Sequence, residues 1–119
     1  MKIAVSASGP NPSDAVDARL GRAASFALYD TETQGWSVLG NVQNASAVQG
    51  AGIQAAELLA RSGVSVVLTG HCGPKAYRAL DAAGVKVCIG ADGTVQEALQ
   101  LYLAGSLQPS TAADVEGHW

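Results

Sequence analysis

The chain has few cysteines and no long apolar run. Its two cysteines, Cys72 and Cys88, are too few for the disulfide framework of a small secreted protein, and we expect both to be thiols in a reducing compartment. No apolar stretch approaches the roughly 18 residues that a membrane span needs, and the chain begins directly with a strand pattern. We therefore expect a cytoplasmic protein without a membrane partner.

Positive charge and aromatic side chains are also scarce. Seven basic residues stand against ten acidic ones, and this net charge of -3 argues against nucleic-acid binding over the whole surface. Aromatic residues make up 5% of the chain and apolar residues 48%, so the core must consist mainly of small aliphatic side chains, as in helices packed on a sheet. A chain of 119 residues can bury such a core as one domain.

Hydrophobic periodicity predicts five strands and three helices. The strands are expected at residues 1–6, 25–30, 36–40, 64–69 and 85–89. The helices are expected at residues 46–63, 74–84 and 94–105, the first and last with capping boxes at Ser46 and Gln49 and at Thr94 and Glu97. We expect residues 1–107 to form the domain and residues 108–119 to form a flexible tail.

These elements predict an α/β fold with helices on both faces of a mixed five-stranded sheet. With the strands numbered in chain order, the expected order is 3-2-1-4-5, and the hairpin connection at residues 31–35 makes the second strand antiparallel. The chain leaves the first strand toward one edge of the sheet and the fourth strand toward the other. A crevice is therefore expected between the carboxyl ends of these two strands.

Two unusual loops are predicted to meet at this crevice. The loop at residues 8–24 is long for a compact domain, which is typical of functional loops, and it contains Arg19 and Arg22. The loop from Gly70 to Lys75 leads into a helix; its glycines permit close backbone approach, and a helix N-terminus favours negative charge. Both loops predict a small anionic ligand.

Several segments resemble the dinitrogenase iron-molybdenum cofactor-binding family. They are Met1-Lys2-Ile3-Ala4-Val5, Leu20-Gly21-Arg22-Ala23, Gly50-Ala51-Gly52-Ile53-Gln54, residues 70–74 and residues 90–105. The resemblance covers residue 1 to about residue 107. It implies a ribonuclease H-like fold and the binding or carriage of a metal-sulfur cluster by a protein that is not an enzyme.

The resemblance also implies the cargo and the partners. The cargo would be a molybdenum-copper sulfide cluster, held without covalent attachment, or an iron-molybdenum-sulfur cluster or its precursor. The partners would be cluster-assembly proteins or ATPases of the cell-division type. Where the family commonly has His-Phe-Gly-Arg, this chain has Arg19-Leu20-Gly21-Arg22. An arginine has no lone pair for a metal, but it pairs well with an anionic thiometallate.

The expected binding residues come from three segments. They are Arg19, Leu20, Gly21, Arg22, Gly50, Gly52, Gly70, His71, Cys72, Gly73 and Lys75. Arg19 and Arg22 would supply charge. His71 and Cys72 are the candidate metal ligands, because a thiol at a helix N-terminus has a lowered pKa. A small packed thiol remains the alternative for Cys72.

An enzyme is the main alternative function. His71 and Cys72, followed after five residues by Arg78, resemble a cysteine phosphatase signature, in which the thiolate attacks phosphorus and the arginine holds the phosphate oxygens. Three features argue against it. Pro74 removes one amide from the phosphate loop, Lys75 stands where that signature has a glycine, and Ala79 replaces the expected hydroxyl residue. An interaction module without a cluster is a third possibility. A nuclease is disfavoured, because the first strand has no carboxylate for divalent metals.

Overall fold

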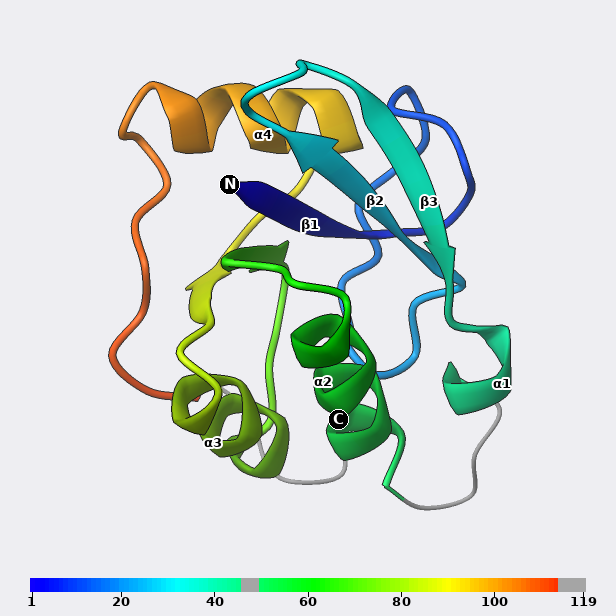
Figure 1. The fold of residues 1–119 in the computed structure, drawn as a ribbon, viewed down its shortest axis with the longest axis vertical. Coiled ribbons are helices and arrows are strands. Elements are labelled where there is room, and N and C mark those ends of the chain that lie inside the picture. The colour runs from blue at the N-terminus through cyan, green and yellow to red at the C-terminus, as the bar shows by residue number, and fades with distance from the viewer. Residues whose placement is uncertain (46–49, 114–119) are drawn as a thin grey trace.

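Five strands form a mixed sheet between two helical layers. The computed structural model describes residues 1–45 and 50–113. The elements are β1 (Lys2–Ala7), β2 (Ser25–Asp30), β3 (Trp36–Gly40), α1 (Val42–Ala45), α2 (Ala51–Arg61), β4 (Val66–Thr69), α3 (Pro74–Ala82), β5 (Lys86–Ile89) and α4 (Val95–Leu103). Figure 1 shows α2 and α3 on one face of the sheet and α4 on the other. In the described part of the chain, each helix is too short or too polar to cross a membrane.

The strand order is β3-β2-β1-β4-β5. The central strand β1 pairs antiparallel with β2 and parallel with β4, while β3 extends the sheet beyond β2 and β5 extends it beyond β4. Both the predicted order and the antiparallel direction of the second strand are confirmed. The chain thus leaves β1 and β4 toward opposite edges of the sheet, which is the topology from which the crevice was predicted.

The sheet separates two apolar clusters. The cluster under α2 and α3 includes Ala4, Phe26, Leu59, Val67 and Leu80. The cluster under α4 includes Ile3, Val5, Leu68, Val95 and Leu99. Because successive side chains of a strand point to opposite faces, β1 contributes to both clusters and is buried on both sides. The two thiols are also separated, since Cys72 belongs to the first cluster and Cys88 to the second.

The helix predicted from residue 46 begins later than expected. α2 starts at Ala51, after Gly50, whose φ of 74° is left-handed. A left-handed residue does not continue a right-handed helix, so the predicted start at Ser46 is wrong. The proposed capping residues Ser46 and Gln49 lie outside the described residues, and the short helix α1 was not predicted.

The capping box predicted for α4 is confirmed. The Thr94 backbone N–H donates to Glu97 Oε1 at 2.9 Å, and the Glu97 backbone N–H donates to Thr94 Oγ1 at 3.1 Å. Hydrogen bonds from the Thr94 backbone and side chain hold the pKa of Glu97 below its ordinary value. Because this folded-state pKa is lowered, the stabilisation by the carboxylate is present at neutral pH and is lost as the pH falls through the folded pKa.

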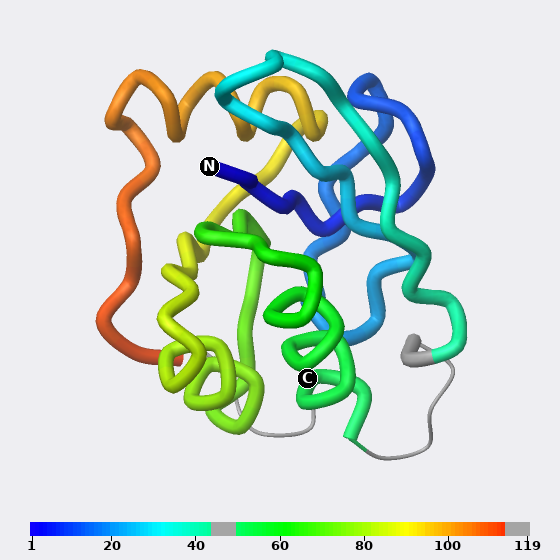
Figure 2. The backbone as a smooth tube through the Cα atoms, in the orientation of Figure 1, coloured from blue at the N-terminus to red at the C-terminus, as the bar shows by residue number. Residues whose placement is uncertain are grey.

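Residues beyond α4 run back along the edge of the sheet beside β5 (Figure 2). The Ser110 backbone N–H donates to Val87 O at 2.7 Å, and the Tyr77 hydroxyl donates to Ser110 O at 2.9 Å. These contacts cover part of an edge strand, whose unpaired backbone groups would otherwise invite association with another chain. The domain boundary at residue 107 and the flexible tail from residue 108 stay predictions.

Replacing Thr94 with Ala should lower the free energy of unfolding by about 1 kcal/mol, because the N-cap of α4 is lost. Urea unfolding at neutral pH measures this change. The exposed Thr111, replaced with Ala, is the matched control and should leave the stability nearly unchanged. Equal stability of the two variants would contradict a stabilising role for the capping box.

Candidate functional site

Three chain segments meet at the carboxyl ends of β1 and β4. They are residues 18–23 of the long loop, residues 50–52 at the start of α2 and residues 70–75 between β4 and the first turn of α3; together we call them the three-segment site. α3 directly follows β4, and α2 runs back along the sheet toward the start of β4. Both helices therefore begin at the carboxyl ends of these strands. Figure 1 shows α2 and α3 lying side by side.

The two loops that were predicted to meet are in backbone contact. The His71 N–H donates to Ala18 O at 2.7 Å, and the Leu20 N–H donates to His71 O at 3.3 Å. These bonds pair Arg19 with His71 as an isolated parallel bridge. A Cβ on Gly70 would lie 2.8 Å from Ala18 O, so the approach requires a residue without a side chain.

Gly21 brings the long loop against the first turn of α2. A Cβ at this position would lie 2.6 Å from Gly52 N and 2.8 Å from Ala51 C, and backbone atoms cannot move aside easily. The close approach therefore depends on glycine. As a result, residues 18–23 are held between the start of α2 on one side and residues 70–73 on the other.

A buried polar group fixes the loop relative to the strand ends. Ser6 Oγ lies 2.7 Å from Asp17 O and 2.8 Å from Thr69 Oγ1, and both hydroxyl-bearing side chains are completely buried. The Asp17 N–H in turn donates to Ser6 O at 2.8 Å, and Asp17 Oδ1 accepts from the Arg19 N–H at 3.1 Å. The loop thus enters the site in a position set by β1 and β4 together.

The side chains of the site divide into two groups. Arg19 and Lys75 are exposed, and Arg22 and His71 are half-buried. Leu20 and Cys72, in contrast, are buried in the cluster below the site, and Cys72 Sγ lies 3.6 Å from Gly73 O. The basic side chains therefore lie toward the surface, and the thiol lies toward the core.

The two helices that begin at the site differ from α4 at their first turns. Within the described residues, α2 and α3 have no side-chain cap and no acidic residue in the first turn, whereas α4 has both. Gly50 and Gly73 occupy the N-cap positions of α2 and α3. No carboxylate of these first turns offsets the positive ends of the two helix dipoles, so they add to the charge of the arginines.

A protein-built metal centre is not formed by the residues that the structure describes. Among them, no three His, Cys, Asp or Glu side chains gather closely enough to hold a metal ion. A bare metal ion would therefore lack the ligand set of a usual site. The described residues of the site instead offer positive charge and helix starts, which favour an anionic ligand.

Asn41, directly after β3, was missed by the sequence analysis. Its side chain is 1% exposed, and its Nδ2 donates to Ala23 O at 2.8 Å and to Gly21 O at 3.3 Å. An asparagine after a strand predicts a turn or a helix cap. Its contact with a loop about twenty residues earlier depends on the tertiary fold, so no local sequence signal indicates this role.

Comparisons with known proteins identify the family. A sequence profile described as dinitrogenase iron-molybdenum cofactor matches residues 1–105. The chain belongs to this family. Family membership confirms the resemblance on which the expected binding segments rest, and it covers the whole three-segment site.

Two solved structures support the same assignment, and one further relative is similar over most of its length. The apo form of the orange protein (ORP) from Desulfovibrio gigas is 43% identical, with a TM-score of 0.93 and 96% of each chain covered. A proposed NifB protein from Thermotoga is 34% identical, with a TM-score of 0.84 and 98% of each chain covered. Protein MJ0580 of Methanocaldococcus jannaschii is 26% identical over 116 residues, covering 91% of this chain and 90% of that protein.

Replacing Gly21 with Ala should lower the free energy of unfolding by about 1 to 3 kcal/mol, because the new methyl group overlaps the backbone of α2. The matched control is Gly40→Ala, since a Cβ at Gly40 meets nothing within 4 Å. Urea unfolding of both variants measures the difference. If Gly21→Ala proved as stable as Gly40→Ala, the close packing of the loop on α2 would be disproved.

Proposed function

We propose that this chain binds and carries an anionic metal-sulfur cluster without covalent attachment. The convergence of Arg19 and Arg22 with the starts of α2 and α3 is the observation on which the proposal rests. Guanidinium groups form strong charge-assisted hydrogen bonds with anions, and helix starts favour negative charge. The description of the family, dinitrogenase iron-molybdenum cofactor, agrees with a molybdenum-containing cargo.

The cargo that we propose is a molybdenum-copper sulfide cluster, or an iron-molybdenum-sulfur cluster or its precursor. Such a cluster brings inorganic sulfide to its metals, so it does not need four protein thiolates. Backbone N–H groups at the glycines of the site would donate to the sulfides, and Lys75 would add charge at the rim. The glycines are Gly21, Gly50, Gly52, Gly70 and Gly73.

His71 and Cys72 are proposed to contribute differently. His71 is half-buried and paired through its backbone with Arg19, so it is the better placed of the two predicted metal ligands. The complete burial of Cys72 argues that its thiol packs beneath the cargo with Leu20. Direct ligation by Cys72 would require the loop above it to move.

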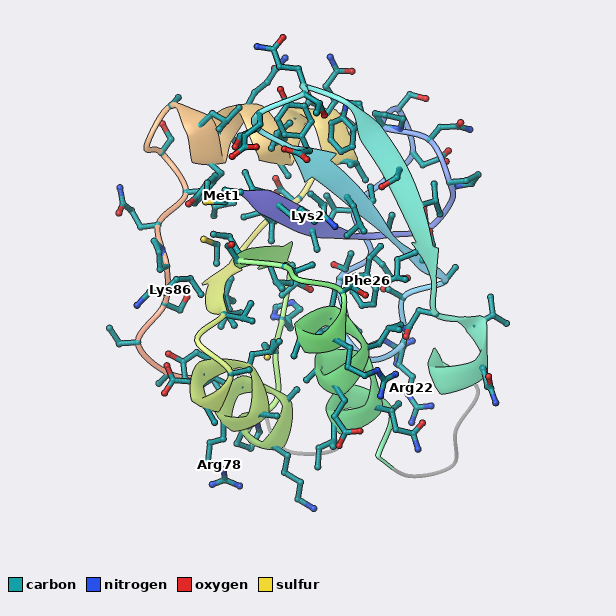
Figure 3. All side chains as sticks on the ribbon, viewed as in Figure 1. Met1, Lys2, Arg22, Phe26, Arg78 and Lys86 are labelled. Atoms are coloured by element: carbon teal, nitrogen blue, oxygen red, sulfur yellow. The ribbon has the colours of Figure 1, made fainter. Side chains whose placement is uncertain are left out.

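The phosphatase alternative gains no support from the geometry. A catalytic thiolate and its arginine must act on one phosphate, yet Cys72 is buried and Arg78 is exposed on α3. Figure 3 shows Arg78 at the outer side of α3, pointing away from the body of the protein. We propose no catalytic residue. The ribonuclease H-like fold stays a prediction. Even with that fold, a nuclease gains no support, because β1 has no carboxylate to hold a divalent metal.

The proposed cellular setting also follows from the resemblance. Cluster-assembly proteins and ATPases of the cell-division type stay predictions as donors and acceptors of the cargo, and the cytoplasmic location stays a prediction as well.

A direct test of the function is anaerobic titration of the protein with thiomolybdate and copper(I). We expect a visible charge-transfer band and molybdenum that remains with the protein through gel filtration. Protein that emerges colourless and without metal would refute the proposal.

Replacing Arg22 with Ala should weaken cluster binding by about 1.5 to 3 kcal/mol, the range for a hydrogen bond to a charged group. The matched control is Arg61→Ala, because Arg61 is exposed in the last turn of α2, at the far end of that helix from the site. The same titration at rising salt should show progressively weaker binding to the parent protein. Equal losses in the two variants would show that Arg22 has no specific role.

Replacing Cys72 with Ala should leave the affinity for the cluster within about tenfold of the parent, because a buried thiol supports the site by packing. Cys88→Ala is the matched control; burial raises the pKa of the Cys88 thiol to about 11, which keeps it neutral on the opposite face of the sheet. Titration of both variants and urea unfolding separate affinity from stability. Abolished binding in Cys72→Ala alone would demonstrate direct ligation.

A further inference from the structure

We infer that Asn41 is a positioning residue of the site, which fixes the backbone on both sides of Arg22. The inference rests on the proposed function, because it assigns a role in holding one of the arginines that would bind the cluster. Asn41 does not contact the cargo in this scheme. It acts through the long loop. Asn41 directly follows the edge strand β3, which lies on the opposite side of β1 from β4.

The hydrogen bonds of Asn41 straddle Arg22. The side-chain Nδ2 donates one hydrogen to Gly21 O at 3.3 Å and the other to Ala23 O at 2.8 Å. A carboxamide nitrogen has two hydrogens, so these carbonyls use both. The backbone N–H of Asn41 also donates to Ala24 O at 3.0 Å. One residue thus binds three carbonyl groups of a four-residue stretch.

Burial makes these hydrogen bonds a strong constraint on the loop. Asn41 is 1% exposed, so water does not replace a lost partner, and a buried amide left without an acceptor is costly. An apolar side chain of similar size would fill the same space and satisfy packing. It would not determine the direction of the Gly21 and Ala23 carbonyls, which only directional bonds specify.

The consequence for Arg22 follows from its two neighbours. Gly21 is pressed against the backbone of Gly52, and Ala23 is completely buried and bound to Asn41. The peptide unit before Arg22 and the peptide unit after Ala23 are therefore held, and the guanidinium extends from a backbone that is anchored on both sides. Figure 3 shows Arg22 beside α2. A binding residue whose backbone is already ordered loses less conformational freedom when its ligand binds.

The test compares Asn41→Ala and Asn41→Ser with Ser25→Ala. Ser25 is the matched control, because it is also buried and its hydroxyl donates to Gly9 O at 3.0 Å, in the same long loop but outside residues 18–23. Titration with a preformed molybdenum-copper sulfide cluster should show an affinity loss of about tenfold or more for Asn41→Ala and a smaller loss for Asn41→Ser. Ser25→Ala should bind like the parent.

Two further measurements distinguish positioning from general destabilisation. In the double variant of Asn41→Ala and Arg22→Ala, the loss should be clearly smaller than the sum of the two single losses, because Asn41 acts mainly through the position of Arg22. In the protein without cluster, Asn41→Ala should shift the amide NMR resonances of residues 21–23. If Asn41→Ala does not fold, Asn41→Ser undergoes the same measurements.

Specific outcomes would overturn the inference. They are binding by a folded Asn41 variant at the affinity of the parent, an equal loss in Ser25→Ala, or fully additive losses in the double variant. A parent protein that binds no cluster would refute the proposed function instead. In that case the NMR comparison still decides the role of Asn41 in the loop, since unshifted resonances for residues 21–23 would show that it does not position Arg22.

Discussion

The parallel pairing of β1 with β4 determines where the other parts of the site lie. Parallel strands end at the same edge of a sheet, so the loops that follow β1 and β4 emerge next to each other. α2 and α3 also begin at this edge. α2 leads into β4 and α3 follows it, and both helices pack on the same face of the sheet. The hydrogen bonds between Ala18 and His71 follow from this adjacency. Topology, more than any single side chain, creates the site.

The elements that were predicted correctly have local signals. The apolar runs at residues 25–30 and 36–40 agree with β2 and β3 residue for residue. Turn residues on both sides of these short strands leave little choice of where each strand begins and ends. The Thr94 cap was also found, since its partner Glu97 is three residues away. The start of α2 was not found, because a local capping pattern at Ser46 does not reveal that Gly50 adopts a left-handed conformation.

At the site, the meeting of the segments was easier to predict than the direction in which each side chain points. We predicted that the two loops meet because Arg19, Arg22 and His71 lie in loops at strand ends. The inward orientation of Cys72 was not predictable, because it depends on how Leu20 and the rest of the cluster close over it. The bonds of Ser6 with Thr69 and of Asn41 with Gly21 join residues 63 and 20 positions apart. A sequence pattern shows that such residues are polar, but the fold selects their partners.

Under the proposed function, the division between basic side chains toward the surface and a buried thiol would suit a carrier that releases its cargo. A cluster gripped by about four thiolates is bound through coordinate bonds and leaves slowly. The exposed Arg19, the half-buried Arg22 and the helix starts would attract an anion through interactions that water and salt weaken. A partner that offers even one additional ligand can then compete for the same cluster. If Arg19 stands where the resemblance to the family implies a histidine, the proposed site exchanges a metal-ligand bond for electrostatic attraction, which would favour release.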